Sequence, residues 1–289
     1  MSKPALGFVG AGRVGTALAT LFSERGYPIA GIADAETTRA ETLKGKVGAA
    51  ASGSDASVFS KASDVLFFAV PDRAIKSLCD GLAGKGGFRK GQVVSHASGA
   101  LGTSVLLSAK MYGAYTLSFH PLQSFAGGEK VVTLAGTYFA LQGDSEALEV
   151  GKEMAHALDG FPVVIGEKEK PLYHAAASLL SNGLVALVRQ GASSLERAGI
   201  KGEEAVAMVL PLLRGTLDHI EQGGVIQALT GPIERGDLET VKAHLKVLEE
   251  RYPEGLGLYR TLSLAILGVA KEKASLSPEA QAELTRLFS

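Results

Sequence analysis

Residues 7–34 read GFVGAGRVGTALATLFSERGYPIAGIAD, a stretch that predicts a strand, a glycine-rich turn, a helix and a second strand. Its glycines follow the pattern G-x-G-x-x-G at Gly10, Gly12 and Gly15. Gly10 allows a tight turn out of the strand, Gly12 lets the backbone approach a pyrophosphate, and Gly15 lets the helix pack closely. Such a turn alone can serve packing only, but here it lies between two predicted strands. We therefore predict a βαβ unit that binds a dinucleotide.

The residues around the turn are the predicted contacts of this cofactor. A helix that begins near Arg13 directs its free N–H groups and the positive end of its dipole at the phosphates. We expect Ala11, Arg13 and Val14 to contact the cofactor together with the three glycines. Asp34 lies 24 residues after Gly10, where a carboxylate binds the ribose hydroxyls of NAD. The predicted cofactor is NAD or NADP.

Charges near the ribose position bear on the choice between the two forms. The carboxylate of Asp34 repels a 2′-phosphate and therefore favours NAD. Arg13 in the turn and Arg39 in the next predicted helix favour NADP, because their side chains could reach that phosphate. On balance the sequence slightly favours NAD.

Composition limits the other classes of function. The chain has 289 residues, a formal net charge of -1, no Trp and one cysteine, Cys79. These values give no basic surface for nucleic acid and no cysteine metal site, and no other metal site is predicted. The sequence contains no run of 18 or more apolar residues, so we predict no membrane helix. Met1 to Pro4 directly precede the first predicted strand and leave no room for a signal peptide. We expect a cytoplasmic protein that binds no nucleic acid and no membrane.

The pattern of apolar runs predicts two domains. Up to residue 166, short apolar runs alternate with helical stretches, which is typical of a doubly wound α/β sheet of the Rossmann type. The runs are Ala5–Val9, Ile29–Ala33, Asp64–Val70, Gln92–His96, Tyr115–Phe119, Tyr138–Gln142 and Pro162–Ile165, with Val47–Ala51 as a weaker candidate. We predict a dinucleotide-binding domain at 1–166.

Beyond this point only helical periodicity remains, so we predict an all-α domain at 167–289 that serves substrate binding and dimerisation. The expected helices are Tyr173–Ala198, Gly202–Gln222, Asp237–Arg251, Leu256–Lys273 and Pro278–Phe288. The first is apolar over much of its surface, which predicts a buried central helix. Ala205–Leu213 and Leu262–Val269 carry more apolar residues than a domain of this size needs, which predicts a homodimer.

In an open parallel sheet, ligands bind beyond the carboxyl ends of the strands. Val70 and Pro71 follow one predicted strand, where they either start a helix or cover the ribose. Ser98 follows the next strand, within His96-Ala97-Ser98-Gly99. Its hydroxyl either caps a helix or binds substrate or the nicotinamide carboxamide.

His120 and Gln123 follow the strand Tyr115–Phe119. An unperturbed imidazole exchanges protons near neutral pH, so His120 is a candidate general acid or base. Pro121 fixes the chain direction behind it. Lone histidines are more often structural, but the position of His120 at this strand end favours a functional role. Gln123 is a candidate for substrate binding.

A polar stripe marks the long helix that follows 167. His174, Ser178 and Asn182 recur at four-residue spacing and share one face. The stripe either forms hydrogen bonds between helices or faces the cleft and binds substrate. Arg235, in a loop further on, either binds an anionic substrate or pairs with Glu234 or Asp237.

The motifs together resemble the uncharacterised Rossmann-like oxidoreductases that carry a helical C-terminal domain of unknown function. The resemblance rests on the glycine pattern, Val70-Pro71-Asp72, His96–Leu101, Phe119–Phe125, Tyr173–Ala176 with Ser181-Asn182, and Leu229–Pro232 with Arg235–Asp237. Wider relatives are pyrroline-5-carboxylate reductase, the β-hydroxyacid dehydrogenases, prephenate dehydrogenase and ketopantoate reductase. This resemblance implies a dehydrogenase or reductase and also favours the homodimer, but it names no substrate.

The β-hydroxyacid dehydrogenases have a catalytic lysine four residues before an asparagine on the interdomain helix. The matching positions here are Ser178 and Asn182, so that lysine is missing. His120 resembles the histidine of a His-Pro pair near the nicotinamide in prephenate dehydrogenase. We rank His120 first and His174 second as proton donor, with Ser98 and Asn182 completing the predicted catalytic set.

The sequence therefore predicts an NAD(P)-dependent oxidoreductase that transfers a hydride between nicotinamide and a small polar metabolite, a keto or hydroxy acid or an imine. Ser178, Gln123 and Arg235 are the predicted substrate-binding residues. The missing lysine motivates the alternative, a dinucleotide-binding sensor or scaffold that does not turn over.

Overall fold

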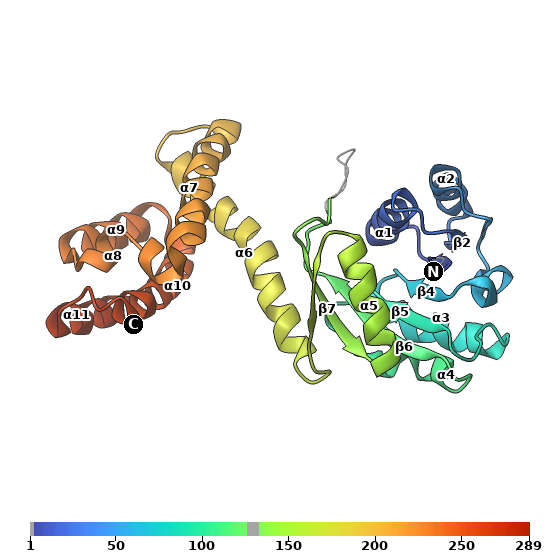
Figure 1. Cartoon of the computed structure of the whole chain (residues 1–289). Coiled ribbons are helices and arrows are strands. Elements are labelled where there is room, and N and C mark those ends of the chain that lie inside the picture. The colour runs from blue at the N-terminus through green and yellow to red at the C-terminus, as the bar shows by residue number, and fades with distance from the viewer. Residues whose placement is uncertain (1–2, 126–132) are drawn as a thin grey trace. The chain divides into compact units, whose positions relative to one another are not determined.

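A computed structural model describes residues 3–125 and 133–289 (Figure 1). The chain divides into two compact units, Met1–Leu180 and Ser181–Ser289. This division lies inside the long helix α6, Lys170–Arg197. The domain boundary that the change of pattern predicts after residue 166 stays a prediction.

The first unit contains the eight-stranded sheet that the apolar runs predict. Its strands are β1 (Leu6–Val9), β2 (Ile29–Ala33), β3 (Ala51–Gly53), β4 (Val65–Phe68), β5 (Val93–His96), β6 (Tyr115–Pro121), β7 (Tyr138–Gly143) and β8 (Phe161–Val164). They lie in the order β3-β2-β1-β4-β5-β6-β7-β8, and neighbours are parallel except β6 and β7. The strand order reverses next to β1, which is the topology of a doubly wound fold.

Most strands differ from the predicted bounds by one or two residues at an end, and the differences at β3 and β6 change the interpretation. The weak candidate Val47–Ala51 is wrong, because Val47 ends helix α2 and β3 begins only at Ala51. Strand β6 continues through Pro121, since its pairing with antiparallel β7 places His120 opposite Ala140. His120 therefore lies within the last two residues of the strand and not in the loop after it.

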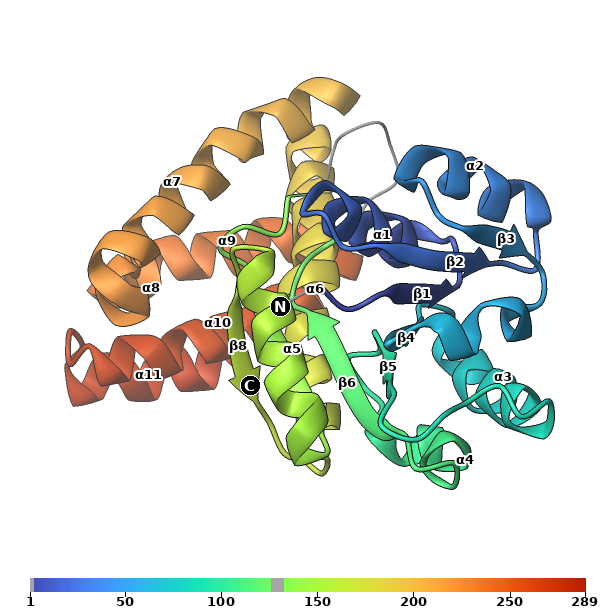
Figure 2. The same cartoon turned by 45° about the vertical axis from the view of Figure 1, so that its right-hand side comes forward.

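Helices cover both faces of the sheet (Figure 2). The bounds are α1 (Arg13–Glu24), α2 (Thr37–Val47), α3 (Asp72–Gly84), α4 (Leu107–Lys110) and α5 (Ser145–Ala157), with short 3-10 turns at Ala56–Val58, Ser60–Ala62 and Thr103–Leu106. Helices α1, α2 and α5 share one apolar core with the sheet, and α3 and α4 share the other. Because both faces are covered, β1 and β4 are buried along their whole length, as their lack of polar alternation predicts.

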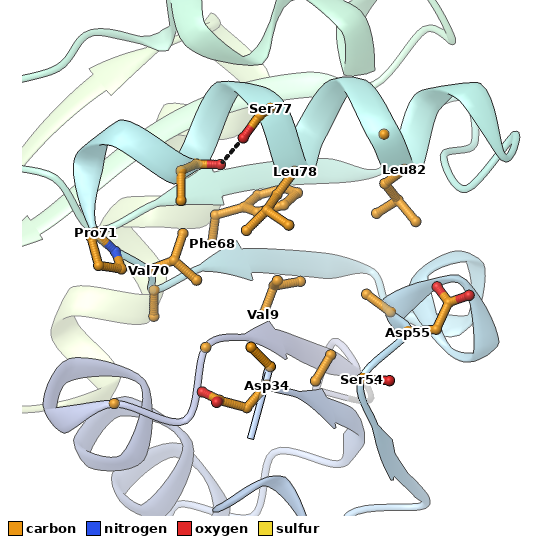
Figure 3. Close-up of a pocket in the computed structure, with 18 of the residues that line it drawn as sticks. Val9, Asp34, Ser54, Asp55, Phe68, Val70, Pro71, Ser77, Leu78 and Leu82 are labelled. Carbon is orange, nitrogen blue, oxygen red and sulfur yellow. Dashed lines mark hydrogen bonds between the residues drawn. The ribbon is translucent and has the colours of Figure 1, made fainter. Parts of the chain in front are cut away.

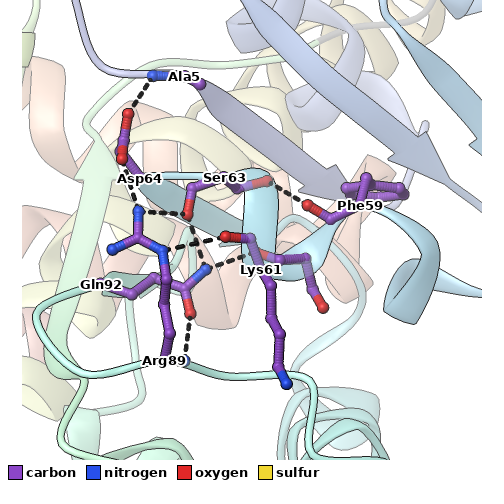
Figure 4. Close-up of polar contacts among 8 residues, drawn as sticks. Ala5, Phe59, Lys61, Ser63, Asp64, Arg89 and Gln92 are labelled. Carbon is purple, nitrogen blue, oxygen red and sulfur yellow. Dashed lines mark hydrogen bonds and ion pairs between the residues drawn. The ribbon is translucent and has the colours of Figure 1, made fainter.

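A polar network fixes the edge of the sheet where β1, β4 and β5 begin (Figure 4). Asp64 accepts a hydrogen bond from the backbone N–H of Ala5 at 2.8 Å and pairs with Arg89 at 2.6 Å. The buried amide of Gln92 donates to the carbonyl oxygen of Ser63 at 2.9 Å. These bonds satisfy backbone groups that would otherwise be buried without partners. They stabilise the edge opposite the carboxyl ends of the strands.

The remaining helices are α7 (Gly202–Ala228), α8 (Pro232–Arg235), α9 (Leu238–Arg251), α10 (Pro253–Glu272) and α11 (Pro278–Phe288). Helix α7 runs further than predicted, with a break at Gly224, whose φ of 76° is left-handed. Leu267 and Ala270 of α10 pack with Val241 and Leu284 into the core of this unit. The excess of apolar residues predicted on α10 is therefore partly used within the chain.

Helix α6 contradicts the prediction of a buried central helix. Leu172, Leu179, Leu180 and Val185 are each more than 70% exposed in the single chain. Among the described helices, α6 alone is long and apolar enough to cross a membrane, by length and composition only. A helix that packs against another subunit has the same composition. Hydrophobic periodicity indicates that such a face needs a partner, but it does not say whether the partner belongs to the same chain.

Candidate functional site

The glycine-rich turn has the geometry that its three glycines predict. Gly10 has a φ of 108°, a conformation that side chains disfavour, and a Cβ there would clash with the carbonyl oxygen of Ala69 in the loop after β4. A Cβ at Gly15 would clash with the carbonyl oxygen of Gly10. Both positions therefore need glycine for packing alone.

Gly12 differs from these two glycines, because a Cβ built on it would meet no atom of residues 3–125 or 133–289 within 4 Å. It is the N-cap of α1 and carries no side chain to cap the helix. The first helical bond runs from the N–H of Thr16 to the carbonyl oxygen of Gly12, so the preceding amides at Arg13, Val14 and Gly15 have no partner within the helix. An open space in front of a helix N-terminus fits a pyrophosphate, which supports the prediction for this turn.

Asp34 stands directly beside the turn. One of its carboxylate oxygens accepts a hydrogen bond from the N–H of Ala11 at 2.7 Å, and the other accepts from the N–H of Glu36 at 2.9 Å. The side chain thus ties the end of β2 to the glycine-rich turn. A carboxylate has lone pairs left for ribose hydroxyls after these two bonds.

A pocket of about 710 Å³ opens over the carboxyl ends of β1, β2 and β4 (Figure 3). Helix α3 forms one wall with Leu78 and Leu82, and Val9 and Asp34 lie across from them. Val70 and Pro71 also line the pocket, and α3 begins at Asp72 as predicted. The pocket joins an apolar wall to a carboxylate and a glycine-rich turn, as a nucleoside with a pyrophosphate requires.

Two basic residues at this pocket each form an ion pair. Arg39 pairs with Glu36 at 2.8 Å, and Lys85 pairs with Asp55 at 2.8 Å. The hydrogen bond from Lys85 lowers the pKa of the Asp55 carboxyl to about 2. Arg39, Asp55 and Lys85 all line the pocket. Arg13, in contrast, extends toward the carbonyl oxygen of Phe125 at 3.5 Å.

A second group of polar residues lies at the ends of β5 and β6, next in order along the sheet. His120 on β6 and His174 on α6 have ring centroids 6.1 Å apart, and the two rings are nearly perpendicular. A Cβ at Gly99 would lie 2.8 Å from Nε2 of His120 and 2.6 Å from Nδ1 of His174. Both imidazoles therefore contact the same glycine, which has no room for a side chain.

The hydroxyl of Tyr173 shares a hydrogen bond of 2.8 Å with Nδ1 of His120. Burial, followed by the charges of Lys170 and His174, lowers the pKa of His120 to about 4. Burial also raises the pKa of Tyr173 to about 12. At neutral pH both groups are uncharged. Depending on the tautomer of His120, Nδ1 either accepts a hydrogen bond from the tyrosine hydroxyl or donates one to it.

Ser98 stabilises a turn and does not cap the next helical segment, Thr103–Leu106, whose N-cap is Gly102, so the predicted capping role is wrong. Its hydroxyl donates to the carboxylate of Asp72 at 2.8 Å and accepts from the N–H groups of Ala100 and Leu101. His96 supports the same turn, because its Nδ1 accepts from the N–H of Ser98 at 3.2 Å. The proposed contact of Ser98 with substrate or nicotinamide is not tested by these bonds.

The other predicted residues are more scattered. Ser178 is half-buried and Asn182 exposed, both on α6, and Gln123 is exposed and accepts from the N–H of Ser124 at 2.9 Å. Arg235 is exposed at the end of α8. Each stays a candidate for substrate binding.

Both acids predicted as alternative partners of Arg235 have other bonds. Glu234 pairs with Lys273 at 3.1 Å, and Asp237 accepts from the N–H of Thr240 at the start of α9. Within residues 3–125 and 133–289, no group of three or more His, Cys, Asp or Glu side chains is arranged to hold a metal ion.

Sequence reasoning missed two residues of the second group. Neither Tyr173 nor Lys170 is among the predicted site residues, although the side chain of Lys170 is fully buried and bonded to Ser118. Lys170, Tyr173 and His174 are spaced i, i+3 and i+4 on one helix face, which is a signal that the sequence does contain. The run Glu167-Lys168-Glu169-Lys170 concealed it, because such alternating charge usually indicates a solvated linker.

Comparison with known families matches both parts of the chain. Residues 2–121 match a Rossmann-like domain, and residues 137–266 match a domain of unknown function, DUF2520. No protein of curated function matches the chain.

Solved structures show the same fold over nearly the whole chain. A protein of Thermotoga maritima is 28% identical with a TM-score of 0.74, over 93% of this chain and 99% of its own. A candidate NADP oxidoreductase of Bacteroides fragilis is 21% identical with a TM-score of 0.74, over 92% and 98%. A pyrroline-5-carboxylate reductase of Coxiella burnetii is 15% identical with a TM-score of 0.60, over 99% of each chain.

These likenesses confirm the predicted fold class and the predicted resemblance to pyrroline-5-carboxylate reductase. The glycine-rich turn and its pocket lie within the first matched region, and α6 to α9 with most of α10 lie within the second. The chain is a Rossmann-like domain followed by a domain of the DUF2520 type.

Proposed function

We propose that this protein is an NAD(P)-dependent oxidoreductase that reduces a carbonyl or imine group of a small polar metabolite, or oxidises the product. The observation that carries the proposal is the pocket over the ends of β1, β2 and β4, beside a glycine turn whose central glycine faces open space. Similar folds named as an NADP oxidoreductase and a pyrroline-5-carboxylate reductase support it.

The residues present fit a dinucleotide. The free amides at the start of α1 would bind the pyrophosphate, Asp34 the ribose hydroxyls, and the apolar wall with Leu78 and Leu82 the adenine. When bound, the nicotinamide would supply or accept the hydride. The protein contributes binding, orientation and control of the proton.

His120 suits proton acceptance better than donation. With a pKa of about 4, its imidazole is neutral at pH 7 and carries no acidic proton to donate; it can accept one only as a weak base, because protonating it at pH 7 costs about 4 kcal/mol. A neutral ring can take the proton of a hydroxyl or amine during oxidation. The imidazole of His174 beside Gly99 is exposed to solvent, so it is the candidate proton donor in the reducing direction. We therefore propose that the two imidazoles share the proton chemistry, with His120 as acceptor.

The preference between NAD and NADP follows from charge. Asp34 beside the ribose position disfavours a 2′-phosphate, and Glu36 already neutralises Arg39. Lys85 is likewise paired with Asp55. We propose NAD as the preferred form, although the likeness to an NADP oxidoreductase argues the other way.

We also propose a homodimer through α6 and α7. Leu212 and Val225 of α7 are 70% and 62% exposed, and the apolar face of α6 is equally uncovered in one chain. Isolated chains rarely leave so many large apolar side chains in contact with water. A second copy would cover both faces, and such a dimer belongs in the cytoplasm, where NAD(P)H is available.

Calorimetry and a turnover assay together test the proposal. We expect NADH or NADPH to bind, and we expect steady cofactor oxidation with at least one member of a panel of keto acids, imines and aldehydes. His120→Asn and His174→Asn should lower turnover while cofactor binding is kept. Binding without turnover across the panel would favour the sensor or scaffold, and no binding of either cofactor would refute both accounts.

A further inference from the structure

Lys170, the first residue of α6, is a charged residue with no exposure to solvent. Its ammonium donates to the hydroxyl of Ser118 at 2.8 Å and to the carbonyl oxygen of Ser98 at 3.3 Å. Ser118 lies on β6, two residues before His120, and Ser98 lies in the turn after β5. A fully buried lysine is rare in proteins and needs partners that compensate for its lost hydration.

Ionisable groups from α3, β5, β6 and the turn before α6 surround this ammonium. Burial lowers the pKa of Lys170 to about 8, and the carboxylates of Asp72 and Glu167 oppose that change. At pH 7 the amine is therefore mostly protonated. Its charge in turn helps to lower the pKa values of His120 on β6 and His96 on β5 to about 4. Burial is the larger cause for both imidazoles.

The bonds of Lys170 also fix the backbone that the imidazoles contact. The carbonyl of Ser98 immediately precedes Gly99, against which His120 and His174 both pack. Without the ammonium, that carbonyl would lose this donor inside the protein, and Ser118 would lose its shortest bond. The lysine therefore acts on His120 in two ways, through the turn and through its charge.

We propose that Lys170 is a positioning residue for His120, which fixes the Ser98–Gly99 turn against β6 and holds a positive charge close to the imidazole. The inference rests on the proposed function, because it assigns His120 as the proton acceptor. Lys170 itself need not contact substrate. Its positive charge adds to the effect of burial and disfavours the protonated form of His120.

The test is an NMR titration of the imidazoles in the cofactor-free protein, with the His120 signal assigned through His120→Asn. Lys170→Met removes the charge, and Lys170→Arg keeps it. Lys152, a half-buried lysine on α5 that pairs with Glu149, provides the matched control Lys152→Met. We expect the pKa of His120 to rise by about one pH unit or more in Lys170→Met and to stay near the wild-type value in the other two.

If Lys170→Met does not fold, Lys170→Gln serves the same test, because its amide can still donate to Ser118. An unchanged His120 titration in a folded uncharged variant would overturn the proposal, as would an equal rise in Lys170→Arg. The titration needs neither cofactor nor substrate. A protein that binds no cofactor or turns over nothing would therefore refute the proposed function and leave this result standing.

Discussion

The variant Gly12→Val tests whether the glycine-rich turn binds a cofactor or serves packing only. The main chain at Gly12 has φ -74° and ψ -170°, a region that valine adopts readily, and a Cβ there meets no atom within 4 Å in the part of the chain that the structure describes. The variant should fold, with a loss of less than about 1 kcal/mol from the poorer helix N-cap. The side chain would instead fill the space in front of the amides of α1.

The expected loss follows from the bonds that the valine blocks. A hydrogen bond to a charged group contributes about 1.5–3 kcal/mol, so blocking one or two phosphate contacts costs about 3 kcal/mol, roughly a hundredfold in Kd. Calorimetry with NADH and NADPH measures this loss, and the melting temperature checks the fold. Gly45→Val, on the exposed side of α2 and also without neighbours, is the matched control. A folded Gly12→Val protein with a Kd within about threefold of wild type would refute a pyrophosphate site at this turn.

Four further predictions follow from single residues. Gly99→Ala should displace both imidazoles and lower turnover at least about tenfold, with cofactor Kd changed less than about threefold; equal turnover would exclude the shared imidazole site. His96 is buried with a pKa of about 4, so the unfolded chain binds more protons between pH 6.5 and 4. Stability should therefore fall by about 3 kcal/mol as pH drops through this window, which urea titrations measure, and His96→Gln should flatten the decline. Leu212→Glu should give a 30 kDa particle by light scattering, whereas the equally exposed Val58→Glu should not change the mass of the wild-type particle; a wild-type monomer would refute the dimer. Asp34→Asn should shift the ratio of NADH to NADPH affinity at least about tenfold toward NADPH, and an unchanged ratio would show that this carboxylate does not select the cofactor.

The first unit was predictable because its signals are local. Buried parallel strands appear as continuous apolar runs, and the glycine pattern states where the backbone must turn and approach. Val47–Ala51 failed because the run is short and half of it completes α2. The antiparallel pairing of β7 was not visible, since strand direction depends on the connection and not on periodicity.

The second group of site residues was only half predictable. His120 and His174 stood out as titratable residues at expected positions, but their shared contact with Gly99 joins segments far apart in the chain. Lys170 was missed because its partners lie 72 and 52 residues away, and no local pattern indicates burial of a lysine between charged neighbours. The prediction of a buried α6 failed for a similar reason, because apolar composition does not say which surface would cover the helix, and its leucines are exposed in the single chain.

The two groups of residues are connected through one chain of bonds. Asp72 begins α3, the helix that forms a wall of the pocket, and it accepts from the hydroxyl of Ser98. The carbonyl of Ser98 accepts from Lys170, which also donates to Ser118 on the strand of His120. A displacement of α3 on cofactor binding would therefore act on the turn that both imidazoles contact. Because each of these bonds is buried or half-buried, breaking any one leaves a polar group without its partner, so the pocket wall and the imidazoles are expected to move together.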